Sequence, residues 1–342
     1  MSDPANPERV AFQETDYAIH NCYLDGAVGY FTGLEADGSS LVVVDLAGDD
    51  PTEVARWSIT SQDERWADVP WTLWPVHDIW VQDGLAALAH WDAGTWLVDV
   101  SDPADPQYVA DVGGRSPADL ADLDERAAHE ATVALPGNSH FVTFDDDRSV
   151  LAVGEEAWNV DETGRGPGGI TLYDVSDPTD PTRLSRVEPP VTPDATFGGT
   201  WTTAHNFELR GDRLYSAWYQ GGVKLHDVSD PAVPEELSWW RQPDEASFWT
   251  ARVGVPGEFF VASSLGDPDP TREAVYVFPD EIGQQANPPA LANVSTGGGN
   301  GSIQQTPTTP TATPTTTTDG QASLGLGVGL GATLYGAWRA RR

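Results

Sequence analysis

Histidines stand at matching places in three stretches of the chain. His20, His77 and His205 lie in the tripeptides IHN, VHD and AHN, each at the entrance of a short apolar run. A neutral imidazole binds transition metals such as Cu and Zn, and it also exchanges protons near neutral pH. His129 and His140 both fit the corresponding place in a further stretch. If the fold gathers these rings, the sequence predicts a transition-metal site for Cu or Zn.

Two other interpretations of the histidines stay open. In one, each imidazole bonds a nearby backbone group or an aspartate of its own stretch, as in His20 with Asp45. His77 and Asp99 are separated by 22 residues. His205 and Asp227 have the same separation, which favours such pairs. In the other, the histidines and nearby side chains form a ligand-binding mouth without metal. The side chains expected there are four aromatic residues and one carboxylate: Phe31, Trp91, Trp158, Tyr219 and Glu155.

The net charge excludes some partners. The chain carries 18 basic and 53 acidic side chains, for a formal charge of −35, and Lys224 is its only lysine. Such a field repels nucleic acid, so we expect no nucleic-acid partner. At about 1 M salt the Debye length falls to roughly 3 Å, which screens self-repulsion. The composition therefore indicates a halophilic protein. A single cysteine, Cys22, excludes an intrachain disulfide.

A Ser-Asp-Pro turn marks the units that must position the histidines. It recurs at 101–103, 176–178 and 229–231, each time after an apolar run that ends in Asp-Val. In the unit at 77–112, four short runs are separated by Asp-Gly, Asp-Ala-Gly and Ser-Asp-Pro. Gly tolerates positive φ and Asp binds local amides, so these separators favour tight turns between antiparallel strands. We predict an all-β chain of five four-stranded units, about 50 residues apart, which is typical of a β-propeller.

The runs WLVDVSDPADP, LYDVSDPTDP and KLHDVSDPAVP resemble the LVIVD repeat of β-propellers found on bacterial and archaeal surfaces, including haloarchaeal ones. This resemblance covers about residues 1–281 and implies a propeller without a defined activity. Scattered His-Asp and His-Glu dipeptides are similar to those of the selenium-binding proteins, or methanethiol oxidases. That second resemblance implies a propeller with histidine-bound copper.

Propeller topology decides where a site would form. The first strand of each unit lines the central channel, and the loops between units lie on the face where these strands begin. The long segments 61–76, 113–128, 188–204 and 241–248 fall on this face, and so does 155–169. Long loops on a rigid scaffold often build binding sites. We therefore expect the site at the channel mouth, beside the histidines.

The two ends of the chain fall outside the regular units. Residues 2–14 have the pattern of a turn and a fourth strand, so we expect them to complete the fifth sheet and close the ring. If the gene begins upstream of Met1, the full propeller has six or seven blades. Residues 282–321 are rich in Thr, Pro and Gly and predict a disordered stalk. Residues 322–342 predict a hydrophobic membrane anchor with a basic tail.

These expectations favour a cell-surface binding module. The stalk and anchor would hold the propeller on the extracellular face of the membrane, and Asn-X-Ser sequons at 293–295 and 300–302 predict a glycoprotein. The partner would be an extracellular ligand or protein, with a glycan as one candidate because aromatic side chains stack on sugars. One alternative is a metal-dependent oxidoreductase with the histidines as ligands. Another is a non-catalytic scaffold of the cell envelope.

Overall fold

Five antiparallel sheets form the chain in the computed structural model, which describes residues 5–35, 38–160, 165–265 and 273–291. Four sheets have four strands and the last has three, and each is a meander in chain order. We name them blades one to five. Most of the expected stalk and all of the expected anchor lie outside the described residues. Within the described part, no helix is long and apolar enough to cross a bilayer.

The strands of the blades follow one another along the chain. Blade one has β1 (Ala18–Asp25), β2 (Val28–Leu34), β3 (Ser39–Asp45) and β4 (Thr52–Trp57). Blade two has β5 (Asp78–Gln82), β6 (Leu85–Ala89), β7 (Thr95–Asp99) and β8 (Gln107–Val112). Blade three has β9 (Ser139–Phe144), β10 (Val150–Glu155), β11 (Ile170–Asp174) and β12 (Thr182–Val187). Blade four has β13 (Phe207–Arg210), β14 (Arg213–Ala217), β15 (Val223–Asp227) and β16 (Glu235–Trp240). Blade five has β17 (Ser247–Val255), β18 (Phe259–Leu265) and β19 (Ala274–Pro279).

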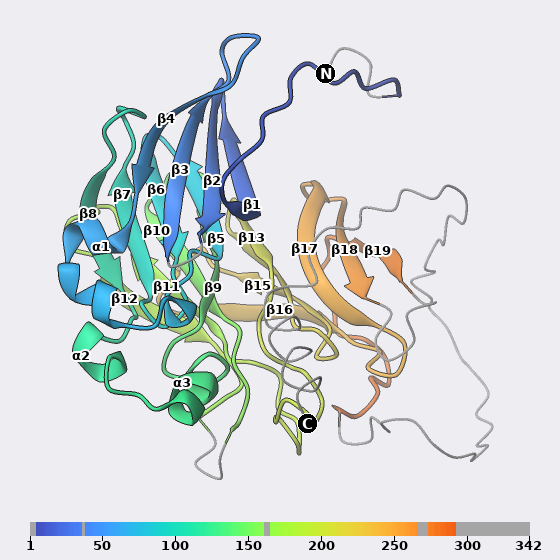
Figure 1. Ribbon diagram of the computed structural model, residues 1–342. Coiled ribbons are helices and arrows are strands. Elements are labelled where there is room, and N and C mark those ends of the chain that lie inside the picture. The colour runs from blue at the N-terminus through green and yellow to red at the C-terminus, as the bar shows by residue number, and fades with distance from the viewer. Residues whose placement is uncertain (1–4, 36–37, 161–164, 266–272, 292–342) are drawn as a thin grey trace.

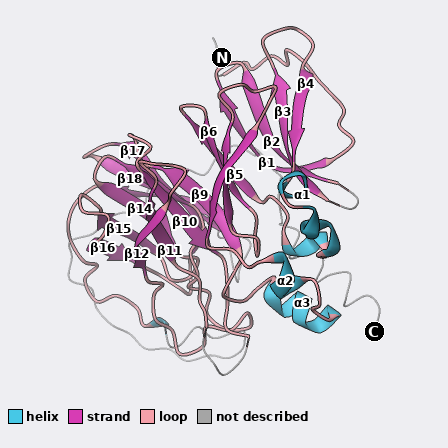
Figure 2. Ribbon diagram, turned by 90° about the vertical axis from the view of Figure 1, so that its left-hand side faces the viewer, coloured by secondary structure: helices cyan, strands magenta, loops and turns pink. Residues whose placement is uncertain are grey.

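The blades are arranged with their first strands innermost. β1 contacts β5, β5 contacts β9, β9 contacts β13, and β13 contacts β17, so the sheets radiate from a common axis (Figure 1). Short helices occupy the long segments between the early blades, on the side where the first strands begin (Figures 1 and 2). They are α1 (Ile59–Gln62), η1 (Glu64–Asp68), η2 (Trp71–Leu73), α2 (Pro117–Leu120) and α3 (Glu125–Ala131).

The Ser-Asp-Pro turn closes on its own aspartates. In blade two, Asp99 accepts hydrogen bonds from the backbone N–H and the hydroxyl of Ser101, and Asp102 accepts one from the N–H of Ala104. Blades three and four repeat this arrangement. The bonds from Ser101 lower the pKa of Asp99. Because the aspartates serve the turns, they do not pair with the histidines. The other half of that interpretation, a hydrogen bond to nearby backbone, is confirmed for His77 and His205.

Apolar side chains between neighbouring blades form the core. Clusters of buried residues join blade one to two, two to three, three to four and four to five. Trp57 and Trp96, with ring centroids 6.1 Å apart, pack across the first junction. Among the described residues, no cluster joins blade five to blade one, because the remaining cluster, around Val42 and Val44, belongs to blade one alone. Four junctions are therefore packed, and we call the fifth the open junction.

The expectation that residues 2–14 complete blade five is wrong. Residues 5–16 form no strand, and within the described ranges β19 has β18 as its only partner. Val10 and Phe12 of this segment are 85% and 72% exposed. Blade five therefore keeps three strands.

The segment after blade five differs from the expected stalk in its first ten residues. The N–H of Gly283 donates to the carbonyl of Leu237, and the side chain of Arg241 donates to the carbonyl of Pro289. Leu291 is buried. Residues 282–291 thus pack on blade four and the segments beside it, so the packed part of the chain extends at least to Leu291.

Two glycines test how tightly the turns are packed. Gly94 and Gly211 have φ of +82° and +52°, where a side chain costs about 1–2 kcal/mol. A Cβ at Gly94 would also lie 2.4 Å from backbone atoms of Val112 and Gly114, whereas one at Gly211 would meet nothing within 4 Å. We expect Gly94→Ala to lower the free energy of unfolding by about 2 kcal/mol more than Gly211→Ala. Urea unfolding in molar KCl, followed by tryptophan fluorescence, measures both. Equal losses would contradict the close packing.

Candidate functional site

One aromatic ring from each blade meets at the channel mouth. His20 and His140 lie in β1 and β9, His77 and His205 precede β5 and β13, and Trp249 lies in β17. The ring centroids are 4.0 Å apart for His20 and His77 and 3.9 Å apart for His77 and His140. The row continues at 4.8 Å to His205 and 3.8 Å to Trp249. The fold therefore gathers four imidazoles from separate stretches of the chain, in blade order. We call them the mouth row.

His129 is not part of the mouth row. It lies in α3, where its side chain is exposed, whereas His140 is only 5% exposed and stacks between two other imidazoles. The sequence left both histidines open for blade three, because each is followed by a plausible strand. The helix in the segment between blades two and three removes His129.

Hydrogen bonds to the next blade orient two rings of the mouth row. Nδ1 of His77 lies 3.0 Å from the carbonyl oxygen of His140, and Nδ1 of His205 lies 2.7 Å from that of Trp249. A carbonyl oxygen only accepts, so each Nδ1 carries the hydrogen and each Nε2 keeps its lone pair. Burial lowers the pKa of His77 well below its usual range and that of His205 to about 3. Both imidazoles are therefore neutral and able to bind a metal.

A carboxylate completes the site, and it is Glu156, not Glu155. Nδ1 of His140 lies 3.1 Å from one Glu156 oxygen, and the hydroxyl of Tyr219 donates to the other. Burial raises the pKa of Glu156 to about 7. The side chain of Glu155 instead pairs with Arg186 of the same blade.

Blade alignment is the signal that would have found Glu156. In blade three the N–H of Glu155 donates to the carbonyl of Gly169. In blade four the N–H of Trp218 donates in the same way to the carbonyl of Gly222. Glu156 therefore holds in blade three the position of Tyr219 in blade four. Trp158, the aromatic residue expected at the mouth in this blade, comes two residues after that position.

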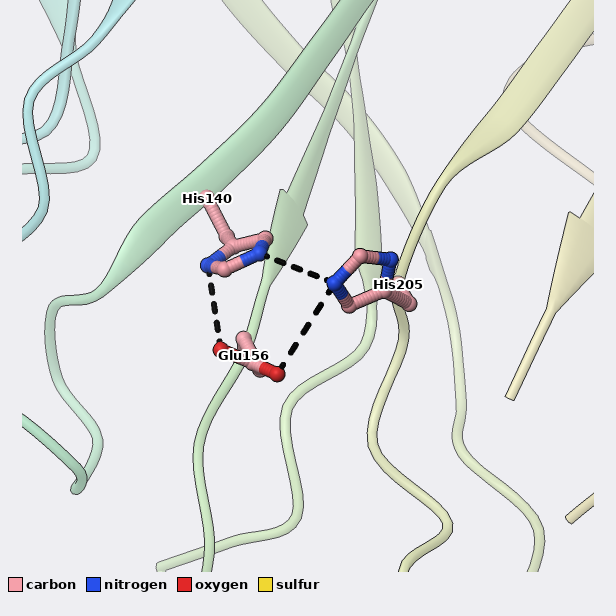
Figure 3. Close-up of side chains that lie close together, drawn as sticks. All are labelled: His140, Glu156 and His205. Atoms are coloured by element: carbon pink, nitrogen blue, oxygen red, sulfur yellow. Dashed lines mark hydrogen bonds and ion pairs between the residues drawn. The ribbon is translucent and has the colours of Figure 1, made fainter. Parts of the chain in front are cut away.

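His140, His205 and Glu156 form a compact set of ligand atoms. One atom from each residue lies within 4.8 Å of the others. The Nε2 atoms of the two histidines are 3.2 Å apart, and Nε2 of His205 is 4.0 Å from Glu156 (Figure 3). Burial and the adjacent imidazoles hold the pKa of His140 well below its usual range. Two neutral imidazoles and one carboxylate are a donor set typical of a transition-metal centre.

The expected aromatic residues are mostly core. Trp91 and Trp158 are 7% and 4% exposed. Trp91 forms a bridge to Ser139. Phe31 lies in the middle of β2, beside Val42. Tyr219 and Trp91 do lie against the mouth row. The ring of Tyr219 is 5.0 Å from His205 and its hydroxyl binds the site carboxylate, and the ring of Trp91 is 6.0 Å from that of His77.

Polar and charged side chains lie beneath the mouth row. Asp78 accepts a hydrogen bond of 2.5 Å from the side chain of Asn21, and burial raises its pKa to about 7. The guanidinium of Arg252, from blade five, lies over the rings of Trp80 and Phe141 at 5.8 and 5.2 Å. Burial lowers the pKa of Arg252. Asn21, Asp78 and Arg252 all belong to first strands, so they follow the mouth row along the axis.

Comparisons with known proteins agree with this architecture. A family model described as the LVIVD repeat matches residues 75–113, which contain blade two. No curated protein matches the chain. A protein of Lactobacillus plantarum has a similar solved structure, with a TM-score of 0.51, 14% identity, and coverage of 76% of this chain and 67% of that one. The chain is therefore a repeat β-propeller whose second blade matches the LVIVD repeat.

Two further solved structures are more distant. The periplasmic gluconolactonase of Pseudomonas aeruginosa has a TM-score of 0.46, 12% identity, and coverage of 74% of this chain and 63% of that one. The computationally designed protein Ika8 has a TM-score of 0.47, 10% identity, and coverage of 80% and 62%. The chain thus spans about two thirds of the length of the structures it matches.

Asp92 offers a test of burial near the mouth. It lies between β6 and β7 with no exposed surface, and burial raises its pKa from 3.8 to about 7 although Arg115 is 3.4 Å away. The folded state therefore holds this proton more tightly than the unfolded state. The stabilisation is complete below pH 3.8 and is lost as the pH rises through about 7.

Asp92→Asn removes this titration, so the melting temperature of the variant should rise relative to wild type between pH 4 and 8. Thermal melts in molar KCl over this range measure the difference. Asp99→Asn is the matched control, because hydrogen bonds from Ser101 lower the pKa of Asp99, opposite to the shift of Asp92. A difference for Asp92→Asn that stays constant with pH would refute the raised pKa.

Proposed function

We propose that this propeller is a metal-dependent oxidoreductase whose channel mouth holds one Cu or Fe ion through His140, His205 and Glu156. The observation that carries the proposal is the convergence of their three ligand atoms within 4.8 Å. Two ligands bound at 2.0–2.1 Å from one metal are about 3.0–3.4 Å apart. The 3.2 Å between the two Nε2 atoms fits that spacing. Imidazole-rich sets select such metals over Ca or Mg.

The surroundings of the ligands support a metal centre. Metal-binding histidines usually donate their other ring N–H to a carbonyl or carboxylate, which fixes the tautomer. His205 has this arrangement with the carbonyl of Trp249. His77 has it with the carbonyl of His140, so its Nε2 is a candidate further ligand. The resemblance to propellers with histidine-bound copper favours redox chemistry over a purely structural ion.

The exposure of the mouth-row histidines supports a route by which substrate could reach the ligand set. His140 and His205 are 5% and 2% exposed, whereas His77 and His20 are only half-buried. Exposure therefore increases from blade four toward blade one. A substrate would reach the ligand set over the rings of His77 and His20. The composition of the tail supports a location at the outer face of a cell membrane.

A groove favours a second function, the binding module. It has a volume of about 550 Å³ and lies between α2, α3 and the segment that leads to β9. Its walls combine apolar side chains, two arginines and two acidic residues: Leu123, Leu135, Val160, Arg115, Arg165, Asp119 and Glu130. Such a lining suits a ligand with an apolar body and polar groups. The groove lies on the same long-loop face as the mouth row.

Metal content tests the main proposal. Protein expressed with Cu, Fe and Zn in the medium and purified in molar salt should carry about one metal ion per chain by mass spectrometry. His140→Ala and Glu156→Gln should each lose most of the metal, whereas His129→Ala, the exposed control, should keep it. If the purified wild-type protein carried no metal, the proposal would be wrong. Zn as the sole metal would support the site but contradict the redox function.

Tyr219 tests the role of the hydrogen bond to Glu156. Tyr219→Phe removes the donor but keeps the ring, so we expect metal affinity to fall about 10-fold. Competition with a chelator measures the affinity. Tyr215→Phe is the control, because its hydroxyl binds Asp280 in blade five's turn region. Equal affinities for Tyr219→Phe and wild type would show that this bond does not tune the ligand.

A further inference from the structure

The outer edge of blade five lacks the strand that the other blades have. In blades one to four the third strand pairs with a fourth, whereas among the residues that the structure describes β19 pairs only with β18. Val275 and Val277 of β19 are 62% and 45% exposed. An unpaired edge with exposed β-branched residues is a template for another strand.

Near its N-terminus the chain also carries a sequence that matches the fourth strand of another blade but does not pair with a sheet. SDPANPERVAFQ, residues 2–13, matches SDPADPQYVADV, residues 101–112, in its Ser-Asp-Pro turn and in the proline three positions later. By this match, 8–13 corresponds to β8. Yet residues 5–16 form no strand, and Val10 and Phe12 are exposed. Residues 8–13 thus have the sequence of the strand that the edge of blade five lacks.

Within one chain these two elements do not meet. Tyr17 is buried against Val42 of blade one, and Asp16 pairs with Arg56 of β4 at 3.0 Å. The end of this segment next to β1 is thus fixed on blade one. In Figure 1 it runs to the N-terminus at the upper end of the molecule, not along β19.

We propose that residues 8–13 of a second copy of this chain pair with β19 as the fourth strand of blade five, in a reciprocal two-fold exchange. An exchanged terminal strand is a common route to dimers, because the contact already suits the same sequence. The open junction leaves β19 and the segment before β1 accessible for the exchange. The inference is independent of the metal site.

The register follows from the other blades. Pro279 pairs with Phe259, the first residue of β18, as Asp99 pairs with Leu85, the first residue of β6. Asp99 also pairs with Gln107, and Leu97 with Ala110. By the same alignment, Ala11 of one copy lies opposite Val277 of the other. Cysteines at these two positions would be close enough to form a disulfide.

Light scattering in molar KCl gives the first test. Because the charge of −35 makes two copies repel each other, the salt must be high. The expected mass is twice the chain mass of 36.7 kDa. A monomer would overturn the proposal.

Cross-linking gives the second test, in a Cys22→Ser background. Ala11→Cys combined with Val277→Cys should give a covalent dimer under diamide, seen on a non-reducing gel. Ala11→Cys combined with Val191→Cys, which changes an exposed residue outside the blades, should not. A disulfide within one chain would show that the strand closes its own blade and would overturn the exchange. A dimer without the disulfide would overturn this interface.

Discussion

The site depends on the hydrogen bond that a mouth-row histidine gives to the backbone of the next blade. His77 donates to blade three and His205 to blade five, so the same bond ties neighbouring blades together and orients a ring. It leaves each Nε2 free, because the carbonyl takes the hydrogen of Nδ1. Side chains on separate sheets could not hold a common ligand geometry without such a fixed reference. The stacking of the rings, at centroid distances of 3.8–4.8 Å, follows from the spacing of the first strands.

Burial makes the acids of the mouth different from those of the surface. The chain has a net charge of −35, and salt screens the exposed carboxylates. Glu156 and Asp78 are removed from that screening, and burial raises the pKa of each to about 7. The mouth therefore combines neutral imidazoles with carboxylates that are reluctant to ionise. A bound cation would supply the positive charge that favours the ionised carboxylate, which gives the proposed metal a physical reason to be there.

The open junction and the mouth row belong to one arrangement. The mouth row begins with His20 on blade one, and Trp249 of blade five continues the line of rings beyond His205. His20 and Trp249 therefore lie on either side of the open junction. Four packed junctions are enough to bring the imidazoles together. The proposed ligands lie on blades three and four, away from the unpaired edge of β19. Strand exchange at that edge can therefore complete blade five without disturbing the ligand set.

The sequence by itself determined the repeat and the strands, and it placed three histidines at equivalent positions of the units. That their rings meet was one of the interpretations it left open. The four runs of the unit at 77–112 became β5 to β8, because alternating apolar runs and Asp, Gly and Pro turns act over a few residues. The choice of His140 over His129, and of Glu156 over Glu155, came only from tertiary structure. Neighbouring residues of a strand or loop point in opposite directions, so a shift of one position exchanges a ligand for a residue paired elsewhere. The separation of residues 5–16 from β19 was also undetermined, because strand pairing between distant segments depends on how the blades pack around the axis.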